Sequence, residues 1–228
     1  MKTSQVLTLI SIYALTGIAF TANAQSSFTL RAGTSIPILD FGSDDYYDDD
    51  AAGAATGLNF GMEYMYTYSE SNLGIFGSID LNINGLQKTV KDALKEEVQA
   101  IAGQALVDHK FPKYVNIPVS CGANYGIDIT ENIAFEVNGG LVLNFLVMTD
   151  YEVTIANVKI VQKADLAESI GFKIGAGFLF KDKFPVTINY YGLGTHKIQM
   201  EVSAAGASET QEVKGKVDML TATLGVRF

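Results

Sequence analysis

Apolar residues recur at every second position in eight stretches of the chain. The clearest stretch runs from Gly57 to Tyr68, where Leu58 and Phe60 alternate with Asn59 and Gly61. Because successive side chains of a strand point to opposite faces, each stretch predicts a strand with one apolar and one polar face. The stretches lie at about residues 28–36, 57–68, 75–84, 115–129, 135–147, 170–180, 186–199 and 220–228.

The connections between these stretches alternate in length. Short polar turns are expected at residues 69–72, 130–132 and 181–184, and long loops at 40–55, 86–112, 149–167 and 202–212. Tight turns at one end, long loops at the other and an even number of strands are typical of transmembrane barrels. The pattern therefore predicts an all-β fold, an eight-stranded antiparallel transmembrane up-and-down β-barrel with both termini at the short-turn end.

The polar face of the predicted strands is too small and too uncharged to meet water. It carries mostly Gly, Ser, Thr and Asn, whereas the outside of a soluble barrel should be rich in Lys and Glu. We therefore expect the apolar face to point outward into lipid, with an aromatic girdle near the short-turn end. The girdle residues are Tyr64, Tyr66, Tyr68, Phe135, Phe178 and Phe180. The alternative is a secreted, lipocalin-like binding barrel in which these rings fill the core.

The first 24 residues have the features of a secretory signal peptide. Lys2 precedes an uncharged apolar run, Val6 to Ala22, and Ala22-Asn23-Ala24 has the small-x-small pattern of a cleavage site. We expect residues 1–24 to be cleaved and residues 25–228 to form the outer-membrane barrel domain.

Composition excludes several other classes of protein. The 228 residues include 16 Lys and Arg against 25 Asp and Glu, a net charge of −9, which disfavours a nucleic-acid partner. A mean hydropathy of +0.18 is too low for a bundle of membrane-spanning helices. The one cysteine, Cys121, allows no disulfide within the chain and is expected on the lipid-facing side of its strand. We expect no cofactor and no bound metal.

The carboxyl terminus, TATLGVRF, resembles the final strand that outer-membrane barrels present to the barrel-assembly machinery. Its alternating residues are Leu220, Ala222, Leu224, Val226 and Phe228. With the segments YVNIPVSCGANYGI and INYYGLGTHKI, the chain resembles the small outer-membrane barrel families. It is most similar to the porin-like barrels of Bacteroidetes and more loosely to the OmpX and OmpW types. Two departures are the lack of Trp and the presence of Pro118, which removes a ladder donor within its strand. Pro118 is expected near the outer end, where a bulge or a rim above the membrane could tolerate it.

This resemblance implies a location and a route of assembly but no substrate. It implies insertion into the outer membrane of a Gram-negative bacterium, in contact with outer-membrane lipid, with extracellular loops and periplasmic termini. We expect a monomer.

Six charged residues are predicted on the inward face of the strands, three of each sign: Arg31, Glu63, Asp80, Glu136, Lys173 and Arg227. Unpaired charges are costly inside a barrel, and balanced signs allow them to pair. An eight-stranded barrel is just wide enough for side chains to fill it. We interpret the group as an ion-pair plug in the lumen; the alternative is a polar lumen that conducts small solutes.

The first predicted loop is acidic and raises the question of cation binding. Hard cations favour carboxylate oxygens, and the loop contains Asp44, Asp45, Asp48, Asp49 and Asp50. The spacing does not match an EF-hand, so a hydrated acidic tip is the preferred interpretation and weak Ca²⁺ binding the alternative.

The second predicted loop contains a helical period. The apolar stripe consists of Leu86, Val90, Leu94, Val98, Ile101 and Ala105. Such a stripe must be buried against something. A lid over the barrel mouth is our first choice; the outer lipid surface and a partner are the alternatives.

His109, beside Asp108, and His196 are the only candidates for enzymatic chemistry, and no spacing places a nucleophile next to a base. We therefore expect no enzyme. The sequence favours a barrel with a filled lumen and a structural or surface-interaction role through its acidic loops. The alternative is a narrow, porin-like channel for small or apolar solutes.

Overall fold

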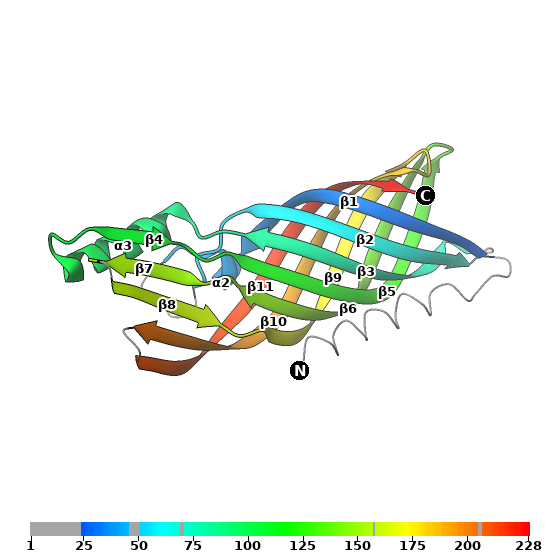
Figure 1. The fold of residues 1–228 in the computed structure, drawn as a ribbon. Coiled ribbons are helices and arrows are strands. Elements are labelled where there is room, and N and C mark those ends of the chain that lie inside the picture. The colour runs from blue at the N-terminus through cyan, green and yellow to red at the C-terminus, as the bar shows by residue number, and fades with distance from the viewer. Residues whose placement is uncertain (1–23, 46–50, 69–70, 157, 205–206) are drawn as a thin grey trace.

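Eight long antiparallel strands close into a ring in the computed structural model, which describes residues 24–45, 51–68, 71–156, 158–204 and 207–228 (Figure 1). Around the ring each strand pairs with the next, and β11 closes the circle by pairing with both β10 and β1. The ring consists of β1 (Ala24–Ile38), β2 (Gly57–Tyr68), β3 (Leu73–Asn84), β5 (Tyr114–Thr130), β6 (Ile133–Met148), β9 (Ala167–Phe180), β10 (Phe184–Ala204) and β11 (Ala207–Arg227). The prediction of an eight-stranded up-and-down barrel is confirmed.

The polar face of the strands points into the lumen and the apolar face points outward, as predicted. On β2, Leu58 and Phe60 are about half exposed on the outside, 54% and 48%, while Asn59 is fully buried in the lumen. The same alternation places Asn82 of β3 and Asn116 of β5 inside. Polar side chains are thus buried and apolar side chains exposed, the reverse of a soluble barrel.

Pro118 is accommodated without the bulge that the sequence suggested. The β3–β5 ladder runs through Ile79↔Val119 and resumes at Asn82↔Asn116 in the same register. The positions between them, which include Pro118, are not paired in this ladder, as expected for a residue without a backbone donor. Strand β5 is therefore unpaired with β3 at these positions but has the same register on either side of them.

Two of the segments predicted as long loops are strands instead. Residues 149–167 contain β7 (Tyr151–Ile155) and β8 (Val158–Ala164). Residues 202–204 belong to β10 and residues 207–212 to β11, and both strands continue past the ring. Together with β4 (Val107–Lys110) they form an extension sheet in the order β11-β10-β8-β7-β4, beyond one end of the barrel (Figure 1). The alternating runs in this sheet are short, so the sequence pattern did not separate them from loops.

Ion pairs lie along the extension sheet at its β4, β7 and β8 strands. Glu152 of β7 contacts Lys110 at 2.8 Å and Lys159 at 2.6 Å. Hydrogen bonds from Lys110 and then Lys159 lower the pKa of the Glu152 carboxyl to about 2. Because both lysine side chains are exposed, these ion pairs add little to the free energy of unfolding.

The first loop closes the mouth of the barrel. Phe41, in the short helix α2 (Leu39–Gly42), is 1% exposed and packs edge-to-face on Tyr114, with ring centroids 5.3 Å apart. Ala54, farther along the same loop, joins this layer. Beneath them, the half of the lumen nearest the first loop is apolar, a feature that the sequence did not predict. This apolar layer includes Val142, Leu146, Tyr191, Leu193, Val217 and Met219.

The predicted helix of the second loop is α3 (Lys88–Ala102), but it is not the lid. Only its first half packs on the rim, through Val90 and Leu94, whereas Ile101 is 79% exposed. The amino groups of Lys91 and Lys95 lie 5.8 and 5.7 Å from the centre of the Phe111 ring and tie the helix to the extension. Within the described residues, no helix is long and apolar enough to cross a bilayer.

Replacing Phe41 by Ala should remove the ring that closes the mouth. We expect a loss of about 3 kcal/mol or more in the free energy of unfolding, the usual cost of a large cavity. The measurement is reversible urea unfolding of the protein in lipid vesicles. Leu39→Ala in the same short helix is the matched control: Leu39 is 60% exposed and should change stability by less than about 0.5 kcal/mol. Equal effects of the two substitutions would show that Phe41 does not close the mouth.

Candidate functional site: the lumen

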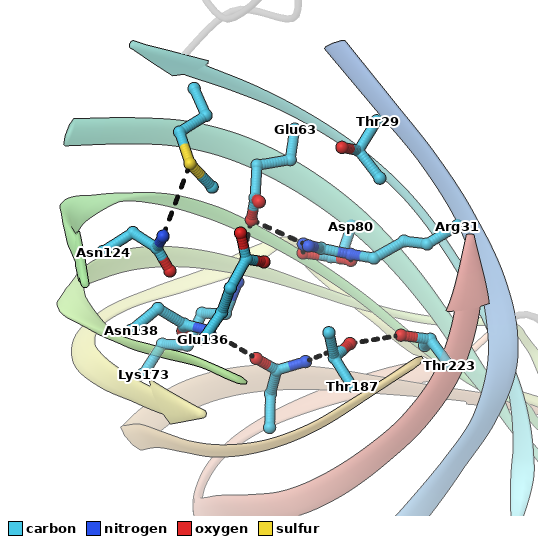
Figure 2. A network of polar contacts seen from close by, with 12 residues as sticks. Thr29, Arg31, Glu63, Asp80, Asn124, Glu136, Asn138, Lys173, Thr187 and Thr223 are labelled. Carbon is cyan, nitrogen blue, oxygen red and sulfur yellow. Dashed lines mark hydrogen bonds and ion pairs between the residues drawn. The ribbon is translucent and has the colours of Figure 1, made fainter. Parts of the chain in front are cut away.

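The six charged residues predicted inside the barrel form two clusters. The first is centred on Arg31 of β1, whose Nη1 donates to Oε2 of Glu63 at 2.8 Å. Its Nη2 and Nε donate to the two carboxylate oxygens of Asp80 at 2.9 and 3.1 Å (Figure 2). Arg31 thus joins β1 to both β2 and β3 through charge-assisted hydrogen bonds, the strongest kind that side chains make.

A glycine on the intervening strand makes this contact geometrically accessible. Arg31 is opposite Gly61 in the β1–β2 ladder, and Gly61 is opposite Asp80 in the β2–β3 ladder. A Cβ at position 61 would overlap the Asp80 carboxylate and crowd Nε of Arg31. The missing side chain therefore gives the guanidinium its path over β2.

Lys173 and Tyr191 complete the first cluster from the opposite side of the ring. The Lys173 side chain is fully buried, with Nζ 3.5 Å from Oε2 of Glu63 and 4.9 Å from the centre of the Phe76 ring. The Tyr191 hydroxyl donates to Asp80 at 2.9 Å. Two cations thus face two anions, which offsets the cost of removing all four charges from water. The sequence did not single out Tyr191, because its strand shows a weaker alternation.

The second cluster is a bidentate pair across the bore. Both terminal nitrogens of Arg227, on β11, donate to the two carboxylate oxygens of Glu136 on β6, each at 2.8 Å. These strands are not neighbours in the ring, so the pair reaches from one wall to another. The interior charges therefore pair in two separate groups.

Little space remains around the charged clusters. Asn and Thr side chains fill the surrounding lumen, including Asn124, Asn138, Thr187 and Thr223 (Figure 2). The cavity that they line with Arg31, Glu63, Glu136 and Arg227 has a volume of about 20 Å³, enough for roughly one water molecule.

The two histidines lie outside the two charged clusters. His196 is fully buried and its Nε2 contacts Ser169 Oγ at 2.8 Å and Asn144 Nδ2 at 2.9 Å. The His109 ring stacks on Phe111 and approaches the Tyr151 hydroxyl, while Asp108 accepts a hydrogen bond from the backbone of His109.

The acidic first loop is only partly described. Asp44 accepts a hydrogen bond from Thr89 at the start of α3, at 2.9 Å. Asp48, Asp49 and Asp50 lie outside the described residues. In the part of the chain that is described, no group of His, Cys, Asp and Glu residues could hold a metal ion.

The aromatic and carboxyl-terminal residues singled out in the sequence lie on the outside of the ring. Tyr64, Tyr68, Phe178 and Phe180 are exposed. Tyr66 and Phe135 are half-buried, the first against Tyr68 and the second against Phe178. On β11 the outward positions are Leu220, Ala222, Leu224, Val226 and Phe228, with Thr221 and Thr223 buried between them. Cys121 is exposed on the same surface.

No protein-family model and no curated protein matches the chain. Solved structures of similar shape include Neisserial surface protein A, with a TM-score of 0.48, 14% identity, and coverage of 90% of this chain and 98% of that one. OprG from Pseudomonas aeruginosa has a TM-score of 0.49 and 11% identity, covering 91% and 98%. A major outer membrane protein from Thermus thermophilus has a TM-score of 0.48 and 12% identity, covering 90% and 99%. The resemblance to the porin-like barrels of Bacteroidetes stays a prediction.

Replacing Asp80 by Asn should leave Arg31 with one carboxylate fewer in a buried site. We expect a loss of about 3 kcal/mol in the free energy of unfolding, because breaking a buried pair leaves an uncompensated charge. Reversible urea unfolding in lipid vesicles is again the measurement. Asp182→Asn, in the exposed turn between β9 and β10, is the matched control and should have an effect below about 0.5 kcal/mol. An Asp80→Asn protein as stable as the control would show that the pair contributes nothing.

Proposed function

We propose that this protein is an integral outer-membrane β-barrel with a closed lumen, and that its role is structural or a surface interaction made through the extension sheet. The observation that carries the proposal is the inversion of the barrel. Arg31, Glu63, Asp80 and Lys173 are buried inside, while large apolar side chains cover the outside. A barrel with this surface needs lipid around it, because so much exposed apolar area would otherwise drive aggregation.

The outward surface supports a membrane-spanning belt. Exposed apolar residues occur on every strand of the ring, for example Ile75 on β3, Leu141 on β6 and Ile170 on β9. Aromatic rings gather where the short turns lie, as expected for a girdle at one membrane interface. The alternating outward residues of β11 fit the signal that the barrel-assembly machinery reads. We take the protein to act as a monomer.

The packed lumen opposes the channel alternative. A solute would have to pass the Arg31 and Arg227 clusters, where the remaining cavity is about 20 Å³, and then the apolar layer beneath Phe41. No enzymatic role is proposed, because His196, which contacts Ser169, is fully buried and out of reach of a substrate. The part left to meet other molecules is the extension sheet with α3 and the acidic first loop, which we place outside the cell.

Purified mature protein should form no channels in planar lipid bilayers. We expect no discrete conductance steps, because paired side chains and the apolar layer beneath Phe41 fill the lumen. A general porin reconstituted in the same bilayers is the positive control for insertion. Reproducible unit conductance from the refolded protein would overturn the closed-lumen proposal, while leaving its membrane location standing.

Cysteine labelling tests the orientation. In a Cys121→Ala background, Gln104→Cys places a thiol after α3, and Lys183→Cys places one in the turn between β9 and β10; both positions are exposed. A membrane-impermeant maleimide applied to intact cells should label position 104 and reach position 183 only after the outer membrane is permeabilised. Labelling of position 183 alone would reverse the orientation, and recovery of the protein in the soluble periplasm would refute the membrane location.

A further inference from the structure

We propose that a cavity between α3 and the extension sheet binds a neutral amphiphile, a molecule with an apolar body and a single hydroxyl or carbonyl group. The cavity lies at the rim of the barrel, where the first loop, α3 and β8 meet. It is separate from the charged lumen and is lined by none of the six interior charges.

The size of the cavity suits a small organic molecule. Its volume is about 260 Å³, whereas a protein cavity of about 150 Å³ holds benzene. Scaling by volume gives a ligand of roughly ten non-hydrogen atoms. The walls are mostly apolar: Leu86, Val90, Leu94, Met148 and Met200 contribute to them. Methionine side chains are flexible and polarizable, so these walls can adapt to different apolar shapes.

The strand register shows which side chains of the sheet face the cavity. Tyr151 is opposite Gln162 in the β7–β8 ladder, and Met200 is opposite Ala164 in the β8–β10 ladder, so these four side chains share one face. Lys163 also belongs to the lining, but its side chain alternates to the other face of β8, where Lys163 is opposite Glu201 of β10. The sheet therefore directs no charged group into the cavity. The acidic residue of the lining is Asp45 of the first loop, which is exposed, so an anionic ligand would meet a like charge and no counter-charge.

One amide on this wall has unused hydrogen-bonding capacity. Gln162 Nε2 lies 2.9 Å from the Met200 sulfur, a weak acceptor, and the side chain makes no other hydrogen bond among the described residues. By contrast, the Tyr114 hydroxyl donates to the carbonyl of Ala52, and the Tyr151 hydroxyl contacts His109. Gln162 can thus both donate to and accept from a ligand, which favours a hydroxyl or carbonyl group over a pure hydrocarbon.

The methionines allow binding to be followed residue by residue. With ¹³C-methyl methionine in lipid nanodiscs, 1-octanol should shift the Met148 and Met200 signals saturably. Met62 is exposed on the lipid face of β2 and reports partitioning of 1-octanol into the bilayer. The shift of its signal should not saturate at the concentrations at which those of Met148 and Met200 do. Octanoate should bind at least about tenfold more weakly, because its carboxylate would be removed from water without a counter-charge and would lie near Asp45.

Matched substitutions locate the site. Ala164→Phe should fill the cavity and abolish the saturable shifts, and Ala52→Leu should do the same from the loop side. Lys159→Ala, on the opposite face of the same strand and outside the lining, should leave binding unchanged. Gln162→Leu should weaken 1-octanol several-fold and leave octane unaffected. The proposal is overturned if Met148 and Met200 shift only in parallel with Met62, if both filling variants still bind, or if octanoate binds as well as 1-octanol.

Discussion

The fold depends on the contacts of one guanidinium group. Arg31 is buried in the lumen of a barrel whose outside is apolar. Its hydrogen bonds to Glu63 and Asp80 tie three consecutive strands together from within. Lys173 and Tyr191 extend this network to the strands opposite. In such a barrel the interior polar groups must form hydrogen bonds and ion pairs with one another. This requirement favours residues of opposite charge at the same level along the barrel axis.

The lumen has two layers that exclude water by different means. The charged layer is filled by paired side chains with their Asn and Thr neighbours, and the outer layer is an apolar core capped by Phe41. The same alternation that fills the lumen provides the lipid-facing belt. In the function proposed above, the barrel is the anchor, and the extension sheet, α3 and the first loop are the surfaces that meet other molecules.

The sequence predicted the ring because alternation over ten or more residues is a strong signal. The bounds of β2 agree with the predicted Gly57 to Tyr68. The six interior charged residues were placed inside only from the alternation of side chains along each strand. Pairing partners could not be predicted, since they depend on ladder register and on the gap at Gly61. The extension sheet was missed because runs such as Tyr151–Ile155 are short. Tyr191 and Phe41 were missed because an apolar lumen layer departs from the expected polar interior.

A double-mutant cycle between Arg31 and Asp80 tests the central claim most directly. The free energies of unfolding of Arg31→Gln, Asp80→Asn and the double variant would be compared with that of the parent protein by reversible urea unfolding in lipid vesicles. If the buried network holds the strands together, the two substitutions should couple by about 2 kcal/mol or more. Additivity within about 0.5 kcal/mol would contradict this claim, because it would mean that the two side chains act independently.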